Sequence, residues 1–194
     1  MARVIDLESF ATLGAFDLIR EQLPNKAEGK VVAIADVGAS TLNINIIEQG
    51  RSIYAGDKEF GGNKLTEDIQ SIYNYSYEEA GKTKRSSTPP DNYEEMVLEP
   101  FKRRMVTEIT RELDKFYSSK YAKQIDYMVL AGGCASIQGI ADSVEESVQA
   151  PTYIANPFIN MTVDKKVNKG RFFEDAPALM LTCGLALRSF DDES

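Results

Sequence analysis

Histidine is absent from this 194-residue chain, and only two cysteines occur. Without histidine, Ser-His-Asp and Cys-His nucleophiles, histidine general bases and most zinc sites are excluded. The cysteines, Cys134 and Cys183, lie far apart in apolar segments, which indicates buried reduced thiols rather than a disulfide framework. Cys134 is expected near the start of a helix, where thiolates are favoured, but a core thiol is the preferred interpretation over a reactive cysteine.

Long apolar runs and an excess of positive charge are also missing. The longest apolar runs, such as residues 31–35 and 128–131, fall far short of the roughly 20 residues that cross a bilayer. The first residues show no basic segment followed by an apolar stretch, so no secretory signal is expected. The net charge of −8 argues against nucleic acid as the main partner, because such binding depends on clustered Lys and Arg. We therefore expect a cytoplasmic chain without direct membrane insertion.

Apolar periodicity and turn residues predict an α/β chain with a mixed sheet. Three closely spaced strands at 31–37, 42–47 and 52–58 are joined by tight turns, which indicates an antiparallel meander. Because these apolar strands are joined to later ones through helices, the sheet should lie between helix layers. The other expected elements are strands at 3–6, 125–130 and 152–155, helices over 10–19, 65–73, 97–116, 137–148 and 178–187, a short helix from 77, and loops at 86–92 and over most of 156–173.

A glycine-containing turn follows the first apolar strand of the meander, at residues 36–40. Its small residues would let backbone N–H groups approach phosphate oxygens, and Ser40 or Thr41 could add a hydroxyl donor. Asp36 would face the same space and could hold a hydrated Mg²⁺. Gly38 alone is equally consistent with an ordinary hairpin glycine.

A second glycine-containing turn ends the strand expected at 125–130, so both turns lie where open sheets bind ligands. Gly132 and Gly133 would let a flat nucleoside lie against the backbone, with Ser136 near the ribose or a phosphate. The same glycines are equally consistent with a tight turn from a strand into a helix.

Residues 77–82 offer a carboxylate and an amine on one helix face, either Glu79 or Glu78 together with Lys82. Pairs at this spacing are usually solvated surface charges, and that is the majority interpretation. No two acids are placed by the sequence in a common cleft, so glycoside hydrolysis is poorly supported.

The order of these motifs resembles the second half of the actin-like ATPase superfamily and, more narrowly, the PilM family of type IV pilus assembly. The similarity runs over nearly the whole chain. It implies an α/β, ribonuclease H-like half, with a mixed sheet that contains the three-stranded meander and a smaller helical subdomain. The matching segments are 36–39 (Asp-Val-Gly-Ala), 60–62 (Phe-Gly-Gly) with 65–69, 78–82, 129–137, 156–158 (Asn-Pro-Phe), 175–178 and 183–186 (Cys-Gly-Leu-Ala).

The resemblance also implies a site for ATP and Mg²⁺. The turn 36–41 matches the second phosphate loop, with Mg²⁺ held by Asp36 through water. Strong hydrolysis is not expected, because Ala39, Ser40 and Asn43 stand where ATPases of the superfamily have more glycine and a later acidic or threonine residue. The implied nucleotide-binding residues are Asp36, Gly38, Ala39, Ser40 and Thr41 at the phosphates, Gly61, Gly62, Glu79 and Lys82 on the adenine side, and Gly132, Gly133 and Ser136 in the adenosine motif.

The same resemblance predicts how the chain is divided. Residues 1–29 would be the remaining strand and linker helix of a first domain, and 30–190 the second domain, with 60–125 as its helical subdomain and 191–194 as a tail. The family carries its first phosphate loop in an earlier domain, and no corresponding strand-turn-strand precedes Arg3. We therefore expect a truncated protein.

The function implied is that of a cytoplasmic adaptor in type IV pilus biogenesis, held at the inner membrane through its partners. The family grips the tail of the membrane protein PilN in a groove of its first half, so this chain should lack that grip. It could still offer a surface to other inner-membrane, motor or regulatory pilus proteins.

Two alternatives belong to the same fold. An ATP-hydrolysing or sugar-kinase-like enzyme would need a placed carboxylate base, and no candidate is singled out by its local sequence. An FtsA-type division protein would normally add an amphipathic membrane helix, for which residues 189–194 are too few and too acidic.

Overall fold

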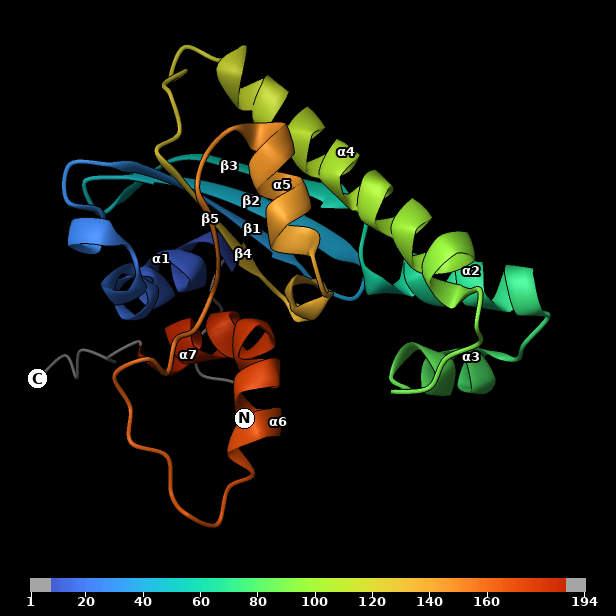
Figure 1. Cartoon of the computed structure of the whole chain (residues 1–194). Coiled ribbons are helices and arrows are strands. Elements are labelled where there is room, and N and C mark those ends of the chain that lie inside the picture. Colours follow the sequence, from blue (N-terminus) through green and yellow to red (C-terminus); the bar gives the residue numbers. More distant parts are fainter. Residues whose placement is uncertain (1–7, 188–194) are drawn as a thin grey trace, which may run out of the picture.

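The computed structural model describes residues 8–187 (Figure 1). The strand expected at 3–6 and the tail at 191–194 lie outside these residues. Within the described part, one sheet is covered by helices on both faces, as predicted. No helix in residues 8–187 has both the length and the apolar content to cross a membrane.

The sheet has five strands in the order β3-β2-β1-β4-β5. The first three strands form the predicted antiparallel meander, whereas β4 runs parallel to β1 and β5 runs parallel to β4. Because β1 and β4 are parallel neighbours, their carboxyl ends meet at the same edge of the sheet. The strands are β1 Val31–Val37, β2 Thr41–Glu48, β3 Arg51–Glu59, β4 Tyr127–Ala131 and β5 Thr152–Ile154.

Alternate side chains of β1 enter two separate hydrophobic clusters, because successive residues of a strand point to opposite faces. Ala33, Ala35 and Val37 pack with α2 (Gly62–Tyr73), α4 (Glu99–Tyr117) and α5 (Ile140–Val148). Val32 and Ile34 pack with α1 (Glu8–Ile19) and α7 (Met180–Ala186) on the other face. Apolar side chains of the segment 60–125 are therefore continuous with the core of the sheet.

The predicted apolar stripe along 97–116 is confirmed as the buried face of α4, with one difference at its start. A π-helix, η3 (Glu94–Leu98), leads directly into α4, and Pro100 occupies the first turn of α4. Tyr93, Leu98 and Glu99 already have helical backbone angles, so Pro100 lies within a continuous helical segment, to which it donates no N–H. The stripe residues Val97, Phe101, Met105, Ile109, Leu113 and Phe116 are all buried.

Elements after β5 differ most from the expectation. Part of the segment expected as loop forms α6 (Lys169–Asp175). The single helix expected over 178–187 is divided into the short helix η5 (Ala176–Leu179), with Pro177 at its start, and α7. The remaining elements are α3 (Tyr77–Lys84), η1 (Arg20–Gln22), η2 (Pro24–Ala27) and η4 (Gly133–Ser136).

Helices α1 and α7 cross at a pair of glycines. A Cβ atom added to Gly184 would lie 1.9 Å from the carbonyl oxygen of Ala11, and one added to Gly14 would lie 3.4 Å from the carbonyl oxygen of Gly184. No real side chain fits at the first of these distances. The two helix backbones therefore touch directly, which brings the beginning and the end of the described chain together.

Candidate functional site

A cavity of about 530 Å³ lies at the carboxyl ends of β1 and β4. It is bordered by the β1–β2 turn, the start of α2, the end of α3 with the loop after it, η3, the start of η4 and the residues after it. The fold thus brings both glycine-containing turns to one cavity. The predicted site residues that line it are Gly38, Ala39, Gly62, Gly133 and Ser136.

The β1–β2 turn is fixed by backbone hydrogen bonds on two sides. The N–H of Gly38 donates to the carbonyl of Thr41, which closes the turn. The carbonyls of Gly38 and Ala39 accept from the N–H groups of Gly62 and Asn63, at 2.9 and 2.7 Å. The turn therefore caps the start of α2, and those N–H groups of α2 are already used. Within residues 8–187, the N–H groups of Ala39 and Ser40 donate to no backbone carbonyl.

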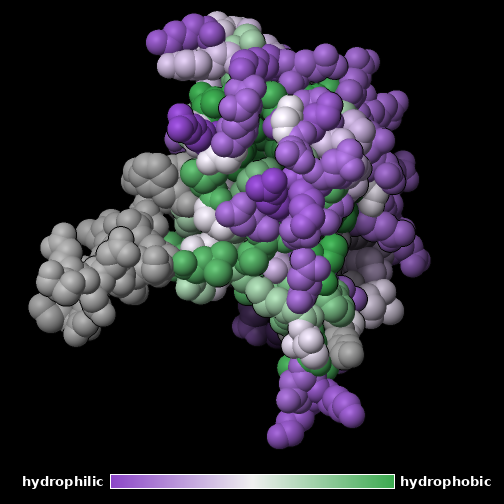
Figure 2. Space-filling model, turned by 90° about the vertical axis from the view of Figure 1, so that its left-hand side faces the viewer, coloured by the Kyte–Doolittle hydropathy of each residue, from purple (hydrophilic) through white to green (hydrophobic). Residues whose placement is uncertain are grey.

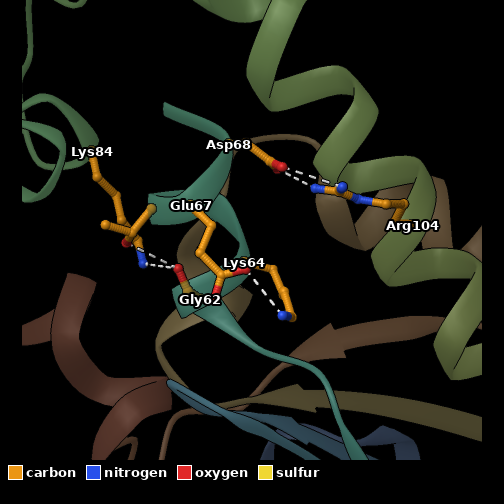
Figure 3. Close-up of polar contacts among 7 residues, drawn as sticks. Gly62, Lys64, Glu67, Asp68, Lys84 and Arg104 are labelled. Atoms are coloured by element: carbon orange, nitrogen blue, oxygen red, sulfur yellow. Dashed lines mark hydrogen bonds and ion pairs between the residues drawn. The ribbon is translucent and has the colours of Figure 1, made fainter. Parts of the chain in front are cut away.

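Glycines 61 and 62 make this close approach possible. A Cβ atom at Gly61 would lie 2.6 Å from the backbone carbon and oxygen of Ala39, and one at Gly62 would lie 2.7 Å from the Lys84 Nζ. The Lys84 ammonium reaches from the end of α3 into the space that Gly62 leaves and donates to its carbonyl at 2.5 Å (Figure 3). Gly61 thus serves packing, and Gly62 makes room for a cation at the cavity.

Lys84 and its neighbour Arg85 are the cations of the lining, and its one acid, Glu94, is ion-paired with Lys102. Burial lowers the pKa of the half-buried Lys84, and the charge of Arg85 acts in the same direction. Among the residues that the structure describes, neither side chain has an acidic partner. Arg85 is exposed, but the half-buried Lys84 beside a glycine turn favours an anionic ligand, because a charge removed from water is costly without a counter-charge.

The residues of α3 that were predicted from the sequence, Glu79 and Lys82, do not line the cavity. Glu79 caps the helix, since its carboxylate accepts from the N–H and the hydroxyl of Ser76 at 2.8 and 2.7 Å. These bonds lower the pKa of Glu79. Lys82 is exposed and forms an ion pair with Glu78 at 2.6 Å. The majority interpretation of surface charges is correct for Lys82. The cavity is instead lined by Lys84 and Arg85, which follow Lys82.

A signal for Lys84 was present in the sequence. Ala80 is fully buried, and Lys84 follows it by four residues, which places both on the same helix face. A lysine one turn after the buried residue of a short helix extends its ammonium either to solvent or to a partner or ligand. The sequence does not show how far this face of α3 is covered, because that depends on the contact with Gly62.

The two glycines after β4 differ in what surrounds them. Gly132 has φ of +81°, and a Cβ atom there would lie 2.3 Å from the carbonyl oxygen of Val37 and 2.5 Å from Oδ1 of Asp36. At Gly133 a Cβ atom would meet nothing within 4 Å, because this residue faces the cavity. Gly132 is thus required for packing of β4 against β1, whereas Gly133 keeps space open.

The family whose description is type IV pilus assembly protein PilM matches residues 1–190. The chain belongs to the PilM family. Residues 38–39, 62 and 133–136 of the cavity all fall within this match. The resemblance to this family and to actin-like proteins in general predicts a nucleotide at this cavity.

Solved structures confirm the actin-like fold. A PilM–PilN type IV pilus biogenesis complex is 22% identical with a TM-score of 0.78, covering 95% of this chain and 52% of that one. The ethanolamine utilization protein EutJ from Carboxydothermus hydrogenoformans is 20% identical, with a TM-score of 0.63 and coverage of 94% and 53%. MreB5 of Spiroplasma citri, bound to ADP, is 17% identical, with a TM-score of 0.60 and coverage of 95% and 59%. The chain thus spans little more than half the length of these proteins.

The remaining predicted residues of this PilM-family chain do not line the cavity. Asp36 is the second-last residue of β1, paired in register with Ala131 and Asn43, and its carboxylate lies beside Gly132. Within residues 8–187, no group of three His, Cys, Asp or Glu side chains could hold a metal ion. The residues outside the lining are Asp36, Ser40, Thr41, Gly61, Glu79, Lys82 and Gly132.

Two further side chains of the lining have structural partners. Ser136 donates its hydroxyl to the carbonyl of Glu174 at 2.8 Å, which joins η4 to α6. Cys134 is buried, with its Sγ 3.7 Å from the carbonyl oxygen of Gly38. Burial raises the pKa of this thiol to about 11, so it is protonated at neutral pH. The interpretation as a core thiol is confirmed.

Proposed function

We propose that the chain is an actin-like nucleotide-binding adaptor of type IV pilus assembly, cytoplasmic and held at the inner membrane through its partners. The observation that supports this most is the cavity at the carboxyl ends of β1 and β4. It combines the unpaired cations Lys84 and Arg85 with the open space at Gly133. Cations beside glycine turns at this edge of a sheet suit a phosphate-bearing ligand.

ATP fits the distribution of groups around this cavity. The adenosine would lie against Gly133 and the backbone of η4, where no Cβ intervenes. Its phosphates would extend toward the turn that contains Ala39 and Ser40, with Lys84 compensating their charge. Asp36, at the end of β1, would hold Mg²⁺ through water. In support, similar structures of MreB5 from Spiroplasma citri are bound to ADP and to AMPPNP.

The contacts of α2 suggest how a bound nucleotide would be sensed. The start of α2 rests on the β1–β2 turn through Gly62 and Asn63. One turn further on, Asp68 of α2 forms a two-pronged ion pair with Arg104 of α4 (Figure 3). A phosphate at the turn would therefore act on α2, and through it on α4. Partners would read that position, among them inner-membrane, motor or regulatory proteins of the pilus.

Isothermal titration with MgATP tests the site directly. Gly133→Leu fills the open space without a backbone clash, so we expect the dissociation constant to rise at least about tenfold while the unfolding midpoint stays unchanged. The matched control is Gly170→Leu, because Gly170 is an exposed glycine of α6 outside the cavity. Equal affinity of wild type and Gly133→Leu would place the nucleotide elsewhere and refute the assignment.

The adaptor role needs a separate measurement. Phosphate release should show at most slow hydrolysis, and a pull-down with purified pilus proteins should recover a partner in a nucleotide-dependent way. Sustained turnover of ATP without any partner would favour an enzyme instead.

A further inference from the structure

The loop between β5 and α6 is the most prominent projection of the fold. It descends below the sheet in Figure 1 and forms the lowest point of the molecule in Figure 2. Residues 156–173 contain one acidic residue, Asp164, and four basic ones: Lys165, Lys166, Lys169 and Arg171. The chain as a whole carries a net charge of −8. This segment is therefore basic on an acidic protein, and the exposed acids Glu174 and Asp175 follow it directly.

Apolar side chains are exposed in the same segment. Ile159, Met161 and Val167 are exposed by 45%, 47% and 41%, and Phe173 at the base of α6 by 46%. Figure 2 shows hydrophobic residues directly above the hydrophilic tip of the projection. Single exposed apolar residues are ordinary, but four within fifteen residues, beside lysines, are typical of an interaction surface.

The loop has a defined shape. Its two ends are clamped by Phe158 and Phe172, whose ring centroids lie 4.5 Å apart. The N–H of Met161 donates to the carbonyl of Phe158 at 2.9 Å, which forms a first turn. The N–H groups of Lys166 and Val167 donate to the side chain and the carbonyl of Asp164, at 2.8 and 3.1 Å, which forms a second. The only acid of the loop thus has its carboxylate bound to backbone, while Lys165 and Lys166 are exposed.

We propose that this loop, residues 159–167 with Phe173, docks directly on an anionic lipid bilayer. Exposed lysines next to exposed apolar side chains suit such a surface, because the ammonium groups meet lipid phosphates while Ile159 and Met161 enter the interfacial region. The charge of the loop is complementary to an anionic surface, and the rest of the acidic chain would be repelled from it. The contact therefore has one orientation, with the projection toward the lipid and the sheet away from it.

Docking at this loop would lie close to the cavity. Helix α6, which follows the loop, is joined to η4 through the hydrogen bond from Ser136 to Glu174. The contact is independent of the nucleotide assignment, because none of its side chains lines the cavity.

Vesicle co-sedimentation of the whole chain tests the proposal. We expect sedimentation with vesicles of phosphatidylglycerol and phosphatidylethanolamine, and none with phosphatidylcholine alone. Lys165→Glu together with Lys166→Glu should weaken binding about thirtyfold or more, since each lysine near an anionic surface contributes about a factor of five. Ile159→Asn together with Met161→Asn should weaken it about tenfold, through lost apolar burial.

A matched control lies at the other end of the molecule, after α4. Lys120 is within 5.0 Å of the ring centre of Tyr121, which is 50% exposed. Lys120→Glu with Tyr121→Asn should leave vesicle binding unchanged. Equal loss with this control would mean non-specific attraction and would overturn the proposal. Failure of the wild type to sediment with anionic vesicles would overturn it as well, leaving an acidic protein surface as the ligand of the loop.

Discussion

The two ends of the β1–β4 pair are built in opposite ways. At the amino ends, Asp126 accepts from the Nζ of Lys30 and the N–H of Val31, both at 2.8 Å, and its own N–H donates to the carbonyl of Val31. At the carboxyl ends, Lys84 and Arg85 line a cavity with no acidic partner within the described residues. One end uses its charges to hold the strands together, and the other keeps charge and space for a ligand.

The difference between the two ends indicates how a ligand site can be recognised in this fold. Both ends contain charged residues, so charge alone does not mark the site. What differs is whether each charged group finds its partner inside the chain. The largest expected effects of mutation should therefore be on stability where groups are paired or packed, and on binding where they are not.

The largest effect should come from Gly132→Ala. Its positive φ and the 2.3 Å distance from its Cβ position to the carbonyl oxygen of Val37 force the strands apart, so we expect a loss of about 3 kcal/mol in the free energy of unfolding. Gly133→Ala is the matched control and should change stability by less than about 0.5 kcal/mol. Urea denaturation measures both. Similar values for the two variants would show that neighbouring glycines do not have separate roles here.

A smaller effect is expected at the paired end. Asp126→Asn removes charge from two hydrogen bonds, which should lower the free energy of unfolding by about 1 kcal/mol at neutral pH. Hydrogen bonding to Lys30 holds the pKa of Asp126 below its ordinary value of 3.8. The stabilisation by Asp126 is therefore present at pH values above its ordinary pKa of 3.8. It is lost as the pH falls through the lower pKa that Asp126 has in the folded state. Denaturation at several pH values should show wild type and variant converging in acid. A constant difference would contradict this.

The smallest effect should have the opposite sign. Lys84→Met removes a half-buried charge, and Gly62 keeps a donor in the hydroxyl of Thr66 at 3.3 Å. We expect stability to rise by about 0.5 kcal/mol, while MgATP binding weakens. Because burial lowers the pKa of Lys84, the gain should be full at neutral pH. It should shrink as the pH rises through the lowered pKa toward the ordinary value of 10.5. A clear loss of stability would show that Lys84 is structural.

Much of the fold could be predicted from the sequence, because its signals are local. The meander follows from alternating apolar residues such as Leu42, Ile44 and Ile46, flanked by tight turns. The four- and three-residue spacing of the stripe on α4 predicted a helix that packs on the sheet. Less could be predicted near α6 and η5, where short helices depend on contacts such as the hydrogen bond from Gly132 to the carbonyl of Pro177.

The site was only partly accessible from the sequence. Both glycine turns were predicted to lie where open sheets bind ligands, and the structure brings them to one cavity. The sequence could not distinguish the roles of Gly132 and Gly133, because these glycines differ in their distance to Val37. In the same way, Glu79 and Lys82 matched a motif by spacing, whereas burial of Lys84 depends on Gly62, 22 residues earlier. The roles of these charges and glycines depend on neighbours that are distant in the sequence and close in the fold.

The glycine crossing of α1 and α7 also has a consequence for how the protein is made. Ala11 is synthesised long before the backbone that it touches, at Gly184. The part of helix α1 that meets α7 therefore stays uncovered until α7 has emerged from the ribosome. Contacts between such distant residues form late and leave a partly folded chain exposed to aggregation. Correct closure of this crossing thus comes only after α7 has been synthesised.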